Sequence, residues 1–110
     1  MASEQPIVAG VAGRYATALF DLALEQKALD QVRAGLDTFE RLVADSDDLK
    51  RLVRSPVFSA DQQEKALVPI LQKAGIDGIT ATFIKLVASN RRLVALPLIV
   101  RAFRELVARH

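Results

Sequence analysis

The chain has no cysteine and no tryptophan, and its only histidine, His110, is the last residue. Without cysteine it can form no disulfide and use no catalytic thiol, and it suits a reducing compartment. A single terminal histidine leaves too little material for a histidine-based metal or acid–base site. The sequence also lacks a Ser/His/Asp set, a glycine-rich phosphate loop and metal-ligand spacing. We therefore expect no catalytic residue, no metal and no cofactor.

Long hydrophobic runs and targeting signals are also missing. No stretch approaches the roughly 18–20 apolar residues that span a membrane. The N-terminus has no basic segment before its first apolar residues and contains Glu4, so we expect no secretory or organellar targeting peptide. Glycine and proline are sparse, whereas 51% of the residues are hydrophobic and 25% are charged. This composition is typical of a folded helical protein, and 110 residues suit a single domain.

Charge is unevenly distributed along the chain, although the net charge is only +2. Residues 1–48 contain four Arg or Lys against nine Asp or Glu, whereas residues 49–110 contain eleven against four. Two interpretations stay open. Either the surface is solvated and simply uneven in charge, or the second half faces an acidic partner or an anionic surface.

Apolar spacing predicts an all-α fold, a compact six-helix bundle without strands. The chain breaks at Pro56, because proline cannot continue a helix, and Pro97 fits only the first turn of the last helix. Ser59 and Gln62 have the spacing of a capping box. The expected helices are residues 6–26 with Ser3 as cap and Pro6 in the first turn, 29–44, 47–53 after Ser46, a fourth from Ser59 to Gly75, 78–89 after Asp77, and one from Arg92 or Leu96 to the end.

Several of these helices carry more apolar surface than one packed side needs. With residues placed about 100° apart, the second helix has an apolar arc of roughly 140°, whereas the first and fifth each have roughly 220°. Two explanations are compatible with these wide arcs. The helices lie in the middle of the bundle, or a groove remains between two of them and accepts an amphipathic helix from a partner. The small residues Ala9, Ala12, Ala16 and Ala88 suit the floor of a shallow groove.

Three motifs, taken in order along the chain, resemble those of a known family. They are Arg14-Tyr15-Ala16-x-Ala18-Leu19-Phe20-Asp21-Leu22-Ala23, then Ser55-Pro56-Val57-Phe58-Ser59 followed by Lys65, then Asn90-Arg91-Arg92-Leu93-x-x-Leu96-Pro97-x-Ile99. In this order and spacing they resemble the delta subunit of bacterial ATP synthases, whose mitochondrial counterpart is the oligomycin-sensitivity-conferring protein.

The resemblance implies a non-catalytic N-terminal domain in the stator, or peripheral stalk, of the proton-translocating enzyme, on the cytoplasmic face of the bacterial inner membrane. In the family this domain binds the N-terminal helix of an alpha subunit, mainly through its first and fifth helices, and holds the catalytic head against rotation. A smaller second domain engages the b subunits in full-length members. We expect that domain to be absent here and expect residues 1–110 to form one domain, with no nucleic-acid partner and no membrane insertion.

The resemblance and the wide arcs together give a set of candidate groove residues. Arg91 and Arg92 are expected to solvate the turn before the last helix or to contact helix-end carbonyls, with an acidic contact in the assembled head as the alternative. Tyr15 has two readings, core packing or a partner contact at the groove edge. The candidates are Val8, Ala12, Tyr15, Ala16 and Leu19 on the first helix and Phe83, Ile84, Val87 and Ala88 on the fifth.

Three other functions are conceivable for the same residues. A nucleic-acid module would use the basic second half, but no basic helix face with interleaved aromatic residues supports it. An enzyme would need catalytic side chains such as those named above, which this sequence lacks. A generic helical adaptor for another complex is the remaining alternative, and identification of the co-purifying partner would distinguish it from the stator subunit.

Overall fold

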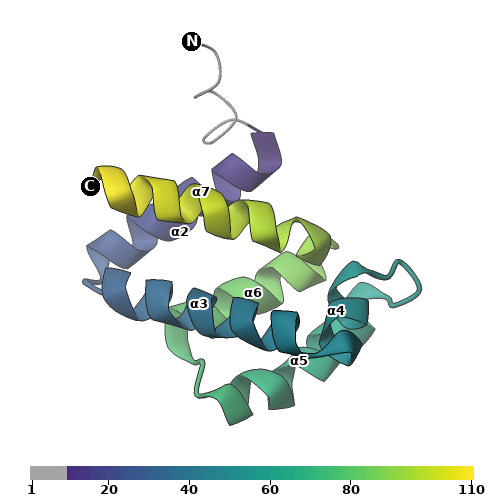
Figure 1. Cartoon of the computed structure of the whole chain (residues 1–110). Coiled ribbons are helices and arrows are strands. Elements are labelled where there is room, and N and C mark those ends of the chain that lie inside the picture. Colours follow the sequence, from purple (N-terminus) through teal and green to yellow (C-terminus); the bar gives the residue numbers. More distant parts are fainter. Residues whose placement is uncertain (1–9) are drawn as a thin grey trace. The chain divides into compact units, whose positions relative to one another are not determined.

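The computed structural model describes residues 10–110 (Figure 1). Within this range the chain forms six α-helices and one short 3-10 helix, and no strand, which confirms the all-α prediction. Labels follow Figure 1. The helices are α2 (Gly10–Glu25), α3 (Leu29–Asp45), α4 (Asp47–Arg54), α5 (Ala60–Ala74), α6 (Gly78–Ser89), η2 (Leu93–Ala95) and α7 (Leu96–Arg109). The expected start of the first helix, with Ser3, Pro6 and Val8, lies outside the described residues.

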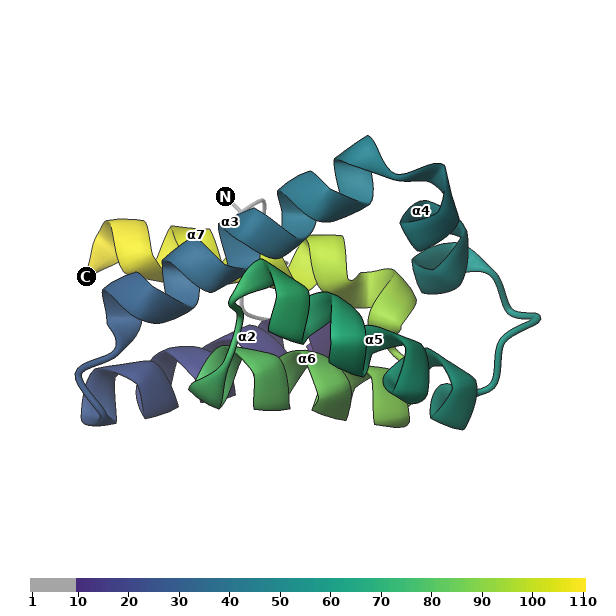
Figure 2. The same ribbon diagram turned by 90° about the horizontal axis from the view of Figure 1, so that it is seen from below.

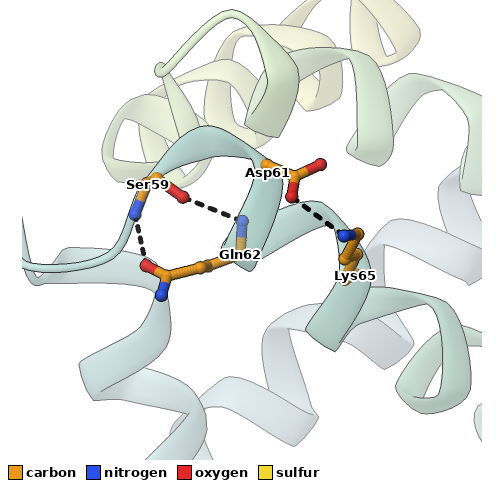
Figure 3. A network of polar contacts seen from close by, with 4 residues as sticks. All are labelled: Ser59, Asp61, Gln62 and Lys65. Carbon is orange, nitrogen blue, oxygen red and sulfur yellow. Dashed lines mark hydrogen bonds and ion pairs between the residues drawn. The ribbon is translucent and has the colours of Figure 1, made fainter.

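Local capping chemistry places most helix starts where the sequence predicted them. The Ser59 hydroxyl accepts from the Gln62 backbone N–H at 3.1 Å, and the Gln62 side chain accepts from the Ser59 backbone N–H at 2.9 Å (Figure 3). This confirms the capping box at α5. Ser46 likewise accepts from the Leu49 backbone N–H at 3.1 Å and begins α4. Asp77 occupies the N-cap of α6, but its side chain makes no capping hydrogen bond there.

The chain divides into two compact units. One unit, the terminal unit, extends to Arg33 and includes Ala95–His110, and the other, the central unit, is Ala34–Val94. In the terminal unit α2 packs against α7. The rings of Phe20 and Phe103 meet edge to face there, with centroids 6.3 Å apart. Pro97 lies in the first turn of α7, where its missing N–H breaks no helical hydrogen bond.

In the central unit α5 packs against α6, and the two helices run side by side in Figure 2. The Gln63 amide nitrogen is buried and donates to the Leu52 carbonyl at 2.8 Å, which joins α5 to the C-terminal turn of α4. Gly35 on α3 lies so close to Thr80 on α6 that a Cβ at Gly35 would stand 2.9 Å from the Thr80 Cγ2 atom. The absence of a side chain at Gly35 therefore sets the approach of these two helices.

Three helices end in a Schellman motif, in which one residue adopts left-handed backbone geometry and two N–H groups cap the last carbonyls. These left-handed residues are Lys27 (φ 55°), Gly75 (φ 75°) and Arg91 (φ 61°). After α6, for example, Arg91 N–H donates to the Ala88 carbonyl at 3.0 Å and Arg92 N–H to the Val87 carbonyl at 2.9 Å. Glycine makes such a turn most easily, so only the end of α5 carried a strong sequence signal.

Candidate partner-binding surface

The candidate residues on α2 lie on both the buried and the exposed parts of this helix. Ala16 and Leu19 are buried, whereas Ala12 and Tyr15 are partly exposed. Residues three or four positions apart lie on the same face of a helix, so the exposed face at Tyr15 continues along α2 through residues at this spacing. We call this the α2 stripe, and it consists of Val11, Tyr15, Ala18 and Leu22.

Leu22 is the most exposed large apolar residue of the α2 stripe, at 39%. On a helical projection the stripe covers roughly 60° beside the buried arc, so it extends the apolar face rather than forming a separate one. Arg14, Asp21 and Glu25 are exposed on the other side of the stripe. The stripe therefore has an apolar centre and a charged rim.

The candidate residues on α6 are all buried. Ile84, Val87 and Ala88 have no exposed surface, and Phe83 is 7% exposed. The apolar arc nevertheless continues past the buried part to Ile79, which is partly exposed, and to Leu86, which is 48% exposed. We call Ile79 and Leu86 the α6 edge.

Leu22 and Leu86 are the residues that the sequence-based candidate set missed. Both lie within the wide apolar arcs of the first and fifth helices, so the arc width already contained the signal. Periodicity gives the amount of apolar surface on a helix but not the side from which neighbours cover it. The predicted groove would take α2 from one unit and α6 from the other, so it stays a prediction, and Val8 lies outside the described residues.

The structure of residues 10–110 bears on metal clusters, membrane-spanning helices and the partners of buried polar atoms. In this part of the chain no three His, Cys, Asp or Glu side chains cluster in a way that could hold a metal ion. None of the described helices is both long and apolar enough to cross a bilayer. Every polar side-chain atom that is fully enclosed in the described region has a hydrogen-bond partner.

The fold and this surface define the class of protein. It is an all-α protein in which two helices, α2 and α6, each have a buried face and exposed apolar side chains beside it. The chain belongs to the ATP synthase delta (OSCP) subunit family, whose sequence model matches residues 11–110. This confirms the resemblance found in the sequence.

Curated relatives carry the same family name and are similar over almost the whole chain. ATP synthase subunit delta of Rhodopseudomonas palustris (strain BisA53) is 62% identical over 109 residues, which cover 99% of this chain and 59% of the relative. The corresponding subunits of Nitrobacter winogradskyi and Bradyrhizobium diazoefficiens are 60% and 58% identical over the same shares. The chain thus spans 59% of the length of these relatives.

Proposed function

We propose that this chain is the N-terminal domain of a delta subunit and a non-catalytic part of the stator of the proton-translocating ATP synthase. It binds the N-terminal helix of an alpha subunit and so holds the catalytic head against rotation. Family membership supports the stator assignment, and the apolar surfaces on α2 and α6 support the choice of an apolar helix as ligand.

The observation that carries the proposal is the exposure of Leu22 and Leu86 beside well-buried arcs of the same helices. An amphipathic helix from a partner presents apolar side chains at intervals of three and four residues, which match the spacing of the α2 stripe. Covering such side chains gives a non-directional attraction of roughly 25 cal/mol per Å² before the costs of association. The charged rim of the stripe then sets orientation more than affinity.

The candidate residues predicted from the sequence have two roles, direct contact with the partner helix or support of the residues that make this contact. Ala12 and Tyr15 are partly exposed and contact the partner helix directly. The buried candidates Ala16 and Leu19, with Phe83, Ile84, Val87 and Ala88, hold α2 and α6 in the shape that presents the exposed residues. Val8 completes the proposed set.

A stator link works by resisting displacement, because the rotating shaft would otherwise turn the head with it. The link needs no reactive group, only contacts that persist under load. The proposed location follows from the family: peripheral on the cytoplasmic face of the bacterial inner membrane, within the assembled enzyme. Contact with the b subunits belongs to a second domain outside residues 1–110.

The test is a titration of the ¹⁵N-labelled chain with a peptide of the cognate alpha-subunit N-terminus. Amide shifts should move along α2 and α6, with the largest changes near Tyr15, Leu22 and Leu86. Leu22→Asp and Leu86→Asp should each weaken binding by about tenfold or more, because each places a charge in an interface that buries an apolar side chain.

The matched control is Val57→Asp. Val57 is 82% exposed and lies in the loop before α5, so this change adds the same charge at a residue that belongs to neither α2 nor α6. Its binding should equal that of the unchanged chain. Unperturbed amides on α2 and α6 at saturating peptide, or normal binding by folded Leu22→Asp and Leu86→Asp variants, would refute the site.

A further inference from the structure

A cleft of about 270 Å³ lies within the central unit, between the end of α4, the loop of residues 55–59 and the turn after α6. Its lining includes Arg54, Pro56, Phe58, Arg91 and Val94. We call it the Arg54–Arg91 cleft. The loop of residues 55–59 projects from this unit in both views (Figures 1 and 2). The lining shares no residue with the α2 stripe or the α6 edge.

Two arginines that pair with no carboxylate of the described residues give this cleft its positive charge. On the same helix as Arg54, the neighbouring Arg51 lies 3.8 Å from Asp48. Within residues 10–110, by contrast, neither Arg54 nor Arg91 forms an ion pair. The lining contains no Asp or Glu. No carboxylate of the described residues therefore pairs directly with either arginine of the cleft.

Exposed apolar side chains lie beside these arginines. Val57 and Val94 are 82% and 61% exposed, more than any other large hydrophobic residue of the described chain. Val94 lines the cleft, and Val57 stands between Pro56 and Phe58, which both line it. The cleft thus combines cationic groups with an apolar wall.

Backbone and amide hydrogen bonds fix the walls of the cleft. The Schellman turn holds Arg91 at φ 61°, with its N–H donating to the Ala88 carbonyl. The bond from Gln63 to the Leu52 carbonyl ties the α4 wall to the α5 wall. Walls that are already ordered lose less conformational freedom when a ligand binds.

We infer that the Arg54–Arg91 cleft binds an acidic peptide segment of a partner protein. Carboxylates of the segment pair with the two arginines, whose planar guanidinium groups match carboxylate geometry. An adjacent apolar side chain of the segment packs against Phe58 and Val94. This site is separate from the surface proposed for the alpha subunit, so each can fail without the other.

Other anionic ligands fit the cleft less well. Its volume lies below the roughly 300–1,000 Å³ of pockets for small molecules. Single-stranded nucleic acid binds along rows of stacking aromatic rings, whereas Phe58 is the one aromatic residue in this lining. Anionic bilayers recruit clusters of roughly four to eight basic residues, and the cleft supplies two arginines.

The test uses the whole 110-residue chain and a short capped synthetic peptide of alternating glutamate and leucine. Amide shifts should appear in residues 55–58 and 91–94 and should weaken as sodium chloride rises. The peptide with glutamine in place of glutamate should bind at least about tenfold more weakly, because it lacks the charge-assisted hydrogen bonds.

Variants assign the effect to the two arginines. Arg54→Gln and Arg91→Gln should each lower affinity by about fivefold or more, and Arg41→Gln, an exposed arginine on α3 away from the cleft, should not. Arg91→Gly removes the charge while favouring the left-handed turn, so it should lose binding without a lower melting temperature.

Equal binding of the glutamate and glutamine peptides would overturn the inference. Shifts confined to other parts of the chain, or unchanged affinity in the folded Arg54→Gln and Arg91→Gln variants, would do the same. The inference would also fail if the peptide caused no shifts while phosphatidylglycerol vesicles or single-stranded DNA bound through Arg54 and Arg91. The ligand of the cleft would then be a lipid or a nucleic acid.

Discussion

Gly35→Ala changes stability through two opposing effects whose sizes the structure allows to be compared. Alanine in place of glycine within an exposed helix favours the helix by about 1 kcal/mol. At Gly35, however, the new Cβ would stand 2.9 Å from Cγ2, 3.2 Å from Oγ1 and 3.3 Å from Cβ of Thr80. All three atoms belong to one short side chain that is 2% exposed.

Thr80 cannot yield easily at this contact. A β-branched side chain is restricted about χ1, and the three contacted atoms lie close to its own backbone. Overpacking of this kind costs about 1–3 kcal/mol. The clash therefore outweighs the gain in helix propensity, and Gly35→Ala should destabilise the chain by about 1 kcal/mol. Urea unfolding followed by circular dichroism, with an unchanged m-value, measures this difference.

The same reasoning predicts a change of sign in a second background. Thr80→Ala removes the two closest atoms, Cγ2 and Oγ1, so the added methyl group at Gly35 then meets only the Cβ of residue 80, at 3.3 Å, which a shift of a few tenths of an ångström relieves. In that background Gly35→Ala should stabilise by a few tenths to about 1 kcal/mol, which gives a coupling energy of about 1–3 kcal/mol between the two positions. A stabilising Gly35→Ala in the unchanged chain, or the absence of coupling, would refute the packing argument.

Gly75→Ala is the matched control for this cycle. A Cβ at Gly75 would meet no atom within 4 Å, but the residue has a φ of 75°. The substitution should cost about 1 kcal/mol through the left-handed backbone alone. Its cost should be the same with Thr80 or Ala at position 80, because a Cβ at Gly75 would reach no atom of residue 80.

Three further predictions concern hydrogen bonds and helix ends. Gln63→Leu should lower the free energy of unfolding by about 1–3 kcal/mol, because it leaves the Leu52 carbonyl without its buried donor; an unchanged urea midpoint would contradict this. Ser59→Ala should cost about 1 kcal/mol through loss of the α5 cap, measured in the same way. Lys27→Gly should instead raise stability by about 0.5–1 kcal/mol, since Lys27 has a φ of 55°, and a lower melting temperature would count against it.

Helix positions were predictable where a short-range chemical signal marked them. Ser59 and Gln62 marked the start of α5, and Gly75 marked its end, because a capping box and a left-handed turn each depend on a few neighbouring residues. The turns at Lys27 and Arg91 have the same geometry without glycine, so their bond pattern appears only in three dimensions.

Small differences at other helix ends have a similar origin. α3 extends to Asp45 rather than Ala44, and α4 to Arg54 rather than Val53. Neither end carries a glycine signal, and terminal turns fray by a residue or two. The close approach of Gly35 to Thr80 depends on residues 45 positions apart, and no local pattern announces such a contact.

The candidate surface was predictable in amount but not in position. Apolar periodicity identified α2 and α6 as helices with more apolar surface than one packed side uses. Which edge stays exposed depends on the neighbours of each helix, so Leu22 and Leu86 emerged only from the structure. The cleft at Arg54 and Arg91 likewise joins segments that are distant in sequence, and an acidic partner for this half of the chain was only one of the two interpretations that the charge imbalance left open.

The measured affinity for an alpha-subunit helix can show which residues supply the binding free energy, the exposed residues or the buried candidates. Full burial of a leucine contributes about 1.5–3 kcal/mol, so Leu22 and Leu86, which are 39% and 48% exposed, together contribute slightly less than that. Association costs at least about 4 kcal/mol. The other exposed residues of the α2 stripe and the α6 edge, such as Tyr15 and Ile79, must supply the rest of the free energy that offsets this cost. The total binding free energy is therefore small, and we expect weak binding. A nanomolar dissociation constant would therefore require the helices to open and present Leu19 and Ile84, which hydrogen exchange would detect as faster exchange on α2 and α6 in the free chain.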